Sequence, residues 1–158
     1  MKTKYTQNDA VNQLIAERSF RAPKHKVWKY YTTSELLDRW WGPKPYQAIT
    51  KSFDFKPGGE WRYVMSGPEG AAHYCINHFR TIDPENSFTA TDSFADENWN
   101  VSAELPTQEW EVTFTEDGEM THVKVVITYQ SLKDLETIVR MGMKEGFNTG
   151  LNQLEELL

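Results

Sequence analysis

The stretch that decides the fold is the last one, residues 131–158, which read SLKDLETIVRMGMKEGFNTGLNQLEELL. Its large apolar residues recur at intervals of three and four, which places them on one face of an α-helix. They are Leu135, Val139, Met143, Phe147, Leu151 and Leu154. Ser131 followed by Asp134 is a capping-box pattern that predicts where this helix begins. The stretch therefore predicts one helix of roughly 40 Å, long enough to cross a small domain.

Three glycines lie four residues apart within this predicted helix: Gly142, Gly146 and Gly150. Each disfavours a helix by about 1 kcal/mol relative to alanine, which is large beside a typical domain stability of roughly 5–15 kcal/mol. Either the glycines allow another backbone to approach the helix closely, or they leave space beside it for a ligand. The pattern alone leaves both explanations open.

Length, charge and cysteine content exclude several classes of protein. A chain of 158 residues predicts a single domain over residues 1–158, with residues 1–10 flexible or loosely packed. The net charge of -6, without a run of Lys and Arg, argues against a nucleic-acid partner. Cys75 is the single cysteine and cannot form an internal disulfide, which predicts a reducing compartment. The polar N-terminus and the absence of a long apolar run predict a cytoplasmic protein without a membrane partner.

The residues before the final helix predict a strand, two short helices and then six strands. The first strand is expected over residues 12–20 and the two helices over 24–31 and 32–41, with Thr32 and Glu35 as a capping box for the second helix. The six later strands are expected over residues 46–55, 60–66, 73–82, 87–94, 108–115 and 119–130. An antiparallel sheet must cover its apolar face, and only the C-terminal helix is long enough to do so. The predicted class is α+β, with a curved antiparallel sheet wrapped around the C-terminal helix in the order β-α-α-β6-α.

Several motifs in this order resemble a known family. They are FRAP at 20–23 followed by Val27 and Trp28, WWGP at 40–43, DFKPGGEWR at 54–62, and GMKEGF at 142–147 followed by spaced leucines. Together they are similar to the activator of heat-shock-protein-90 ATPase homologue-like family. That family belongs to the START-like, helix-grip (SRPBCC) superfamily of the birch pollen allergen. The resemblance covers nearly the whole chain and implies a curved sheet that grips a long C-terminal helix around a cavity.

The resemblance also bears on the glycines and on one strand. Gly142 and Gly146 lie within the family-like run, so we expect them to serve a close approach of the helix to the sheet. Gly150 and Asn77 depart from the family pattern, because many members have a polar residue at the first position and glycine at the second. We therefore expect Gly150 to border any ligand that is particular to this chain.

Aromatic residues on successive strand faces, opposite the glycine-bearing helix, predict an apolar ligand cavity with a few polar groups. The expected ligand-binding residues are Trp41, Trp61, Tyr63, Asn77, His78, Phe88, Trp110, Phe114, Met143, Phe147 and Gly150. Plain core packing is the alternative for most of the rings. We expect a cavity of roughly 300 Å³ or more beside the helix, since ligand sites have that size. The adjacent Trp40 and Trp41 cannot share a helix face, so one should pack inward and the other should cover the cavity mouth or stay exposed.

Catalytic and metal chemistry have weaker signals. His73 and His78 are separated by an odd number of residues on one predicted strand, so they should point to opposite faces and form no metal site. No metal and no cofactor is predicted. Asp92 could meet one of these histidines inside the cavity as an acid and base pair, or it could simply face solvent. Cys75 is expected to be a buried, inert thiol.

Three functions follow from these patterns, and binding ranks first. The first is binding of a small hydrophobic or amphipathic molecule, with the loop at 95–106 and its Trp99 as a lid. The second, implied by the resemblance, is a co-chaperone-like module with a chaperone as its partner. The third is an enzyme of the cyclase or hydrolase type that uses the same cavity, although a non-enzymatic role is favoured. The chain is expected to be a monomer or a homodimer.

Overall fold

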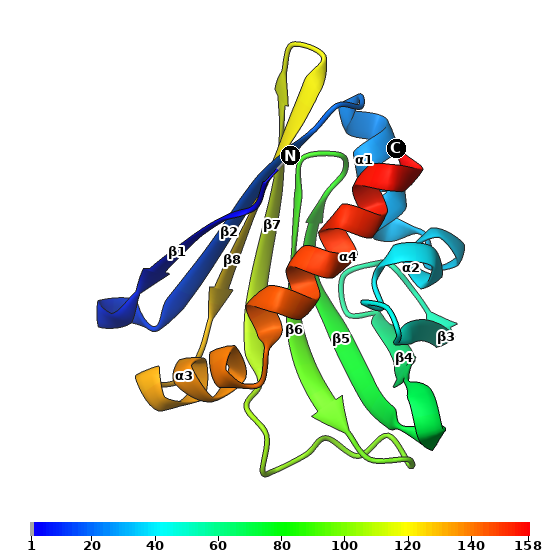
Figure 1. Cartoon of the computed structure of the whole chain (residues 1–158), viewed down its shortest axis with the longest axis vertical. Coiled ribbons are helices and arrows are strands. Elements are labelled where there is room, and N and C mark those ends of the chain that lie inside the picture. Colours follow the sequence, from blue (N-terminus) through cyan, green and yellow to red (C-terminus); the bar gives the residue numbers. More distant parts are fainter. Residues whose placement is uncertain (1) are drawn as a thin grey trace.

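One antiparallel sheet of eight strands dominates the computed structural model, which describes residues 2–158. The strand order in the sheet is β1-β2-β8-β7-β6-β5-β4-β3 (Figure 1). The strands are β1 (Lys4–Asn8), β2 (Gln13–Phe20), β3 (Gln47–Phe53), β4 (Glu60–Ser66), β5 (Ala72–Asp83), β6 (Ser87–Ala95), β7 (Gln108–Asp117) and β8 (Met120–Thr128). The sheet contains the expected first strand and all six later ones.

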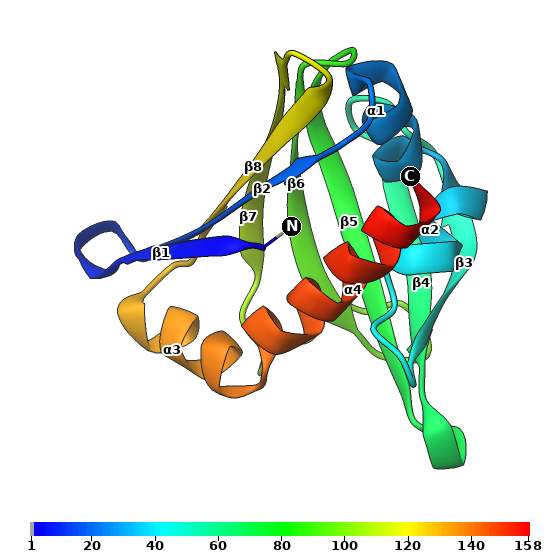
Figure 2. The same ribbon diagram turned by 45° about the horizontal axis from the view of Figure 1, so that its top comes forward.

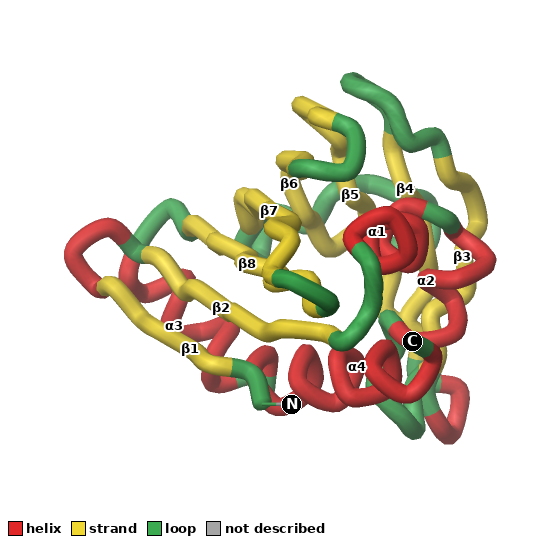
Figure 3. The backbone as a smooth tube through the Cα atoms, turned by 90° about the horizontal axis from the view of Figure 1, so that it is seen from above, coloured by secondary structure: helices red, strands yellow, loops and turns green. Residues whose placement is uncertain are grey.

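Four α-helices lie on the concave side of the sheet. They are α1 (Lys24–Thr32), α2 (Ser34–Trp40), α3 (Leu132–Arg140) and α4 (Met143–Leu157). Seen from above, the strands form an arc with α4 running along its open side (Figure 3). The turned view shows α4 crossing in front of the sheet and ending beside α1 and α2 (Figure 2). None of the helices in residues 2–158 has the length and apolar character needed to cross a bilayer.

The alternation of apolar and polar residues explains how the strands face the helices. On β7, Val112 and Phe114 are buried on the inner face, whereas Glu109 and Glu111 are exposed on the outer face. The hairpin from β7 to β8 turns at Gly118, whose φ of 62° is the left-handed conformation that glycine tolerates. Because side chains alternate between the two faces of each strand, the apolar residues of neighbouring strands together form a continuous inner surface.

The C-terminal segment is two helices rather than the single helix that its apolar spacing predicts. Gly142 lies between α3 and α4 with φ 93° and ψ 23°, a left-handed conformation that ends one helix and begins the next. Ser131 caps α3 as predicted, because its Oγ accepts a hydrogen bond from the Asp134 N–H at 3.1 Å. Of the expected stripe, Leu135, Leu151 and Leu154 are buried, whereas Val139, Met143 and Phe147 are half-buried. Ile138, outside that stripe, is buried as well.

Two further expectations are corrected near the N-terminal half. Within the stretch expected to be flexible or loosely packed, Lys4–Asn8 forms β1, paired antiparallel with β2, although most of its side chains are exposed. Thr32 does not cap α2, because it is the last residue of α1 and its Oγ1 donates to the Trp28 carbonyl at 2.8 Å. The helix α2 instead begins after Thr33, whose side chain makes no capping bond.

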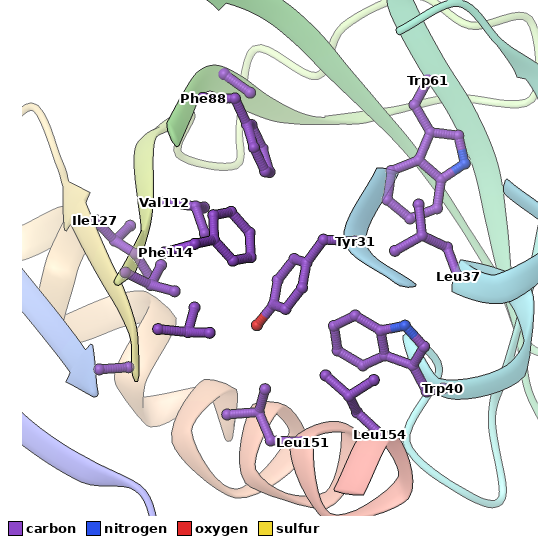
Figure 4. Packing of buried hydrophobic residues seen from close by; sticks show 14 of the residues in the cluster. Tyr31, Leu37, Trp40, Trp61, Phe88, Val112, Phe114, Ile127, Leu151 and Leu154 are labelled. Carbon is purple, nitrogen blue, oxygen red and sulfur yellow. The ribbon is translucent and has the colours of Figure 1, made fainter. Parts of the chain in front are cut away.

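The hydrophobic core fills the space between the sheet, α1, α2 and α4. Figure 4 shows Tyr31 at its centre, with Phe114 and Val112 from the sheet on one side and Trp40 and Leu154 on the other. Trp40, Leu154 and Leu135 have no exposed surface. The core therefore ties both short helices to the C-terminal helix and leaves little free volume.

Candidate functional site

A narrow cavity lies between the inner face of the sheet and the helices α1 and α2. Its volume is ≈ 30 Å³, space for about one or two water molecules. The lining residues are Tyr31, Leu37, Trp41, Trp61, Asn77, Phe79, Phe88, Ala90, Trp110 and Val112. The expected volume of roughly 300 Å³ is therefore wrong for this structure, because the aromatic rings fill most of the space.

A row of polar residues crosses the inner face at the edge of this cavity. Asn77 on β5 is the direct partner of Asp92 on β6, and Asp92 is the direct partner of Gln108 on β7. The Gln108 Nε2 donates to Asp92 Oδ2 at 3.2 Å, and the Tyr129 hydroxyl donates to Gln108 Oε1 at 2.7 Å. The other end of the row is unpaired, since Asn77 Oδ1 and Asp92 Oδ1 are buried without a hydrogen-bond partner.

The Asp92 carboxyl is the most perturbed acid among the described residues. Burial raises its pKa from 3.8 to about 7, against a smaller opposing effect of the Ser93 N–H. The residue as a whole keeps some exposed surface, but Oδ1 is shielded from solvent, so the carboxyl senses the protein interior. A carboxyl of this kind exchanges its proton near neutral pH.

Two more titratable groups lie beside Asp92 and stay neutral. Burial raises the pKa of the Cys75 thiol to about 12, and it also raises the pKa of the Tyr63 hydroxyl. The nearby Asp92 contributes to both increases. Cys75 is therefore protonated and unreactive, as expected for a buried thiol. The Tyr63 hydroxyl accepts a hydrogen bond from Trp41 Nε1 at 2.9 Å.

Trp41 closes one side of the cavity. Its ring centroid lies 5.7 Å from that of Trp61, 5.9 Å from that of Trp110 and 6.0 Å from that of Phe147. Trp41 is half-buried, whereas its neighbour Trp40 is fully buried, so the pair divides between interior and cavity wall as predicted. Trp41 is thus the ring that joins the sheet side of the cavity to α4.

The predicted site residues lie at different depths around the cavity. Trp41, Trp61, Asn77, Phe88 and Trp110 line the cavity. Tyr63 stacks on Trp61 with centroids 4.1 Å apart, and Phe147 contacts Trp110 at 5.5 Å, so both lie just behind the lining. Phe114 packs deeper in the core against Tyr31, and Met143 is half-buried on the first turn of α4. The sequence therefore predicted which aromatic rings lie close together more accurately than it predicted which residues line the cavity.

Gly150 lies against another backbone and does not line the cavity. A Cβ atom built on it would be 3.2 Å from the Trp40 carbonyl oxygen and 3.5 Å from that of Trp41. Of the two explanations for the glycines, close backbone approach therefore applies at this position. The neighbouring helix is α2 rather than the sheet.

His78 and the 95–106 loop lie on the outer side of the sheet. His78 Nδ1 is 3.0 Å from Glu60 Oε2 on that face, so the alternative in which His78 pairs with Asp92 inside the cavity does not apply. His73 is exposed near the start of β5 and also makes no contact with Asp92. Trp99 packs on Tyr74 with centroids 5.2 Å apart and under the Arg62 guanidinium at 5.6 Å, so Trp99 lies on the outer face and does not cover the cavity as a lid residue.

Five lining residues were missed by the sequence reasoning: Tyr31, Leu37, Phe79, Ala90 and Val112. Phe79, Ala90 and Val112 lie on the inner face of β5, β6 and β7. The alternation of side chains along each strand would have predicted this position. Tyr31 and Leu37 come from the two short helices, whose position relative to the sheet has no local sequence signal. Among residues 2–158, no group of three His, Cys, Asp or Glu side chains is arranged to hold a metal ion.

A curved antiparallel sheet that grips a C-terminal helix defines a helix-grip protein. The sequence profile described as activator of Hsp90 ATPase homolog 1-like protein matches residues 21–158. The chain therefore belongs to this family, which confirms the resemblance.

Solved structures agree with this assignment. Protein Ms6760 from Mycobacterium smegmatis is 32% identical, with a TM-score of 0.92 over 99% of this chain and 96% of that one. A protein from Arthrobacter aurescens is 26% identical, with a TM-score of 0.91 over 96% of this chain and 88% of that one. CalU16 from Micromonospora echinospora, at 17% identity, 98% and 84% coverage and a TM-score of 0.63, shares the fold alone. The comparison with curated proteins gave no match.

Proposed function

We propose that this domain binds a small amphipathic molecule on the inner face of the sheet, at the cavity bordered by Trp41, Asn77 and Trp110, which α4 adjoins through the contact of Phe147 with Trp41. One observation carries the proposal: two sheet residues of the cavity lining and the aspartate beside them each have a buried polar atom without a hydrogen-bond partner. These atoms are Asn77 Oδ1, Asp92 Oδ1 and Trp110 Nε1. An apolar core built only for packing has no reason to keep such groups together.

The energetic argument follows from the usual cost of unpaired groups. Each buried donor or acceptor without a partner costs about 1–3 kcal/mol, and a ligand that pairs with it recovers much of that free energy. The surrounding rings supply apolar contact, which is the other half of a typical small-molecule site. The polar atoms would thus orient a ligand that the rings hold.

A ligand larger than a few heavy atoms requires the cavity to open, because its volume is ≈ 30 Å³. Trp41 and Phe147 are the rings best placed to move, since both are only half-buried and both lie at the α4 side of the cavity. Outward rotation of Trp41 would give up its hydrogen bond to Tyr63. The binding site is therefore proposed to widen on the helix side while the sheet side stays fixed.

Fragment binding followed by two-dimensional NMR tests this proposal. Small aromatic alcohols and amines should shift the indole N–H signals of Trp41 and Trp110 and the amide signals of Asn77 and Ala90. Ala90→Val narrows the cavity by filling it from the sheet side and should weaken binding at least tenfold, whereas Glu111→Ala on the exposed outer face should not. Unshifted cavity signals across the fragment set, or equal affinity in both variants, would contradict the proposal.

The other two functions have no comparable support. The family description names an activator of the Hsp90 ATPase, and that role remains a second proposal for this chain. The exposed large apolar side chains among the described residues come from four segments: Val11, Ile49, the pair Val101 and Leu105, and Met141. Catalysis ranks third, because His78 pairs with Glu60 on the outer face and His73 is exposed, so neither supplies a base for Asp92.

A further inference from the structure

The unpaired end of the polar row has a distinct chemical character. Asn77 Oδ1 and Asp92 Oδ1 are both hydrogen-bond acceptors, and they come from residues directly opposite each other on adjacent strands. Side chains in that relation have Cβ atoms about 4.5–5.5 Å apart, close enough for one group to contact both. When the Asp92 carboxyl is ionised, these two acceptors on neighbouring strands call for a donor between them.

The charges around Asp92 indicate what kind of donor fits. The groups that face its carboxyl are Asn77 and Cys75 on β5, Tyr63 on β4, Gln108 on β7 and Tyr129 beyond β8, and none of them is a cation. Within residues 2–158, none of the salt bridges involves Asp92. A carboxylate in this position therefore has no positive counter-charge of its own.

Aromatic rings complete the surroundings of this carboxylate. Trp61 is the direct partner of Asn77 on β4, and Trp41 and Trp110 lie within 6 Å of each other across the cavity. The faces of such rings attract cations, most strongly those of tryptophan. Several rings line the cavity, and one uncompensated carboxylate adjoins its lining residue Asn77, a composition that suits an organic cation.

We propose that the ligand carries a protonated amine, whose N–H groups donate to Asp92 Oδ1 and Asn77 Oδ1 while the aromatic rings surround its apolar part. This inference rests on the proposed function and names the ligand class for the same site. The raised pKa of Asp92, about 7, agrees with it, because a bound cation would stabilise the ionised carboxylate that burial disfavours. Binding near neutral pH is therefore coupled to release of the Asp92 proton.

The test compares two probes that differ in one group, the 2-phenylethylammonium ion and neutral 2-phenylethanol, by isothermal titration calorimetry. The ammonium probe is expected to bind at least tenfold more tightly at pH 8, and to lose most of that advantage at pH 5.5, where Asp92 is protonated. At pH 7, repeating the titration in buffers of different ionisation enthalpy should reveal net proton release to the buffer.

Two variants, each of which replaces one carboxyl group by an amide, distinguish binding at the cavity from binding at the surface. Asp92→Asn should remove the preference for the ammonium probe, whereas Glu60→Gln on the outer face should keep it. Circular dichroism and thermal melts establish that both variants fold, and the pH series on the unmodified protein tests the inference without any variant. Equal affinity for the two probes at pH 8 would overturn the amine inference and leave the proposed function standing. Failure of both probes to bind would overturn the inference and count against the proposed function as well.

Discussion

At the scale of single residues, Asp92 is the one whose chemistry the fold changes most. Its neighbours on β5 and β7 are amides, Asn77 and Gln108, and only the second of them donates a hydrogen bond to it. Burial then keeps the carboxyl protonated up to about pH 7. An exposed aspartate at a strand end would titrate near its ordinary value, so the structure decides against that alternative.

The raised pKa of Asp92 predicts a dependence of stability on pH with a definite sign. The folded protein holds this proton between about pH 4 and pH 7 and the unfolded chain does not, so the contribution to stability is present at low pH and is lost as the pH rises through 7. Relative to Asp92→Asn, the free energy of unfolding of the wild type should be about 2–3 kcal/mol larger at pH 5 than at pH 8. Urea denaturation of both proteins at the two pH values measures this difference, and a constant difference would show that Asp92 titrates normally.

At the scale of elements, the three glycines of the C-terminal segment have three different surroundings. Gly142 ends α3 in a left-handed conformation, and Gly150 allows α4 to approach the carbonyls of Trp40 and Trp41. Gly146 has neither role, since a Cβ atom there would meet only Pro43 Cγ at 3.7 Å. Their regular spacing of four residues therefore reflects no single structural cause.

Alanine at two of these positions should shift stability in opposite directions. Gly146→Ala is expected to raise the free energy of unfolding by about 0.5–1 kcal/mol, because the helix interior gains propensity at no steric cost. Gly142→Ala should lower it by about 1–2 kcal/mol, because an alanine is strained at a φ of 93°. Guanidinium denaturation of the two variants makes the comparison, and a stable Gly142→Ala variant would mean that α3 and α4 can join into one helix.

At the scale of the whole molecule, Gln153 on α4 holds the segment that carries Trp41. Its Nε2 donates to the carbonyls of Trp40 at 3.0 Å and Gly42 at 2.8 Å, and its Oε1 accepts from the Lys44 N–H at 3.0 Å. These three bonds join parts of the chain more than a hundred residues apart. They fix the exit of α2 against the C-terminal helix, and with it the ring that closes the cavity.

Removal of this link should loosen the cavity wall as well as the fold. Gln153→Ala is expected to lower the free energy of unfolding by about 1–2 kcal/mol, since each bond contributes about 0.5–1.5 kcal/mol and water replaces part of the loss. Hydrogen exchange of the Lys44 amide should accelerate at least tenfold in the same variant. The neighbouring Asn152→Ala change, on an exposed position of α4, serves as the control. Unaltered exchange at Lys44 would show that the segment is held by packing alone.

Local patterns in the sequence determined the strands β2 to β8, the capped start of α3 and the apolar inner face, because each depends on a short-range pattern that a single segment carries. They also placed Trp61, Phe88 and Trp110 around a common space. They did not indicate β1. Only the tertiary structure decided three other features. These are the face of the sheet on which His78 lies, the volume left between the aromatic rings, and the contact of Asp92 with Asn77 and Gln108. Strand register and the docking of α1 and α2 set these features, and both depend on contacts between residues far apart in the chain.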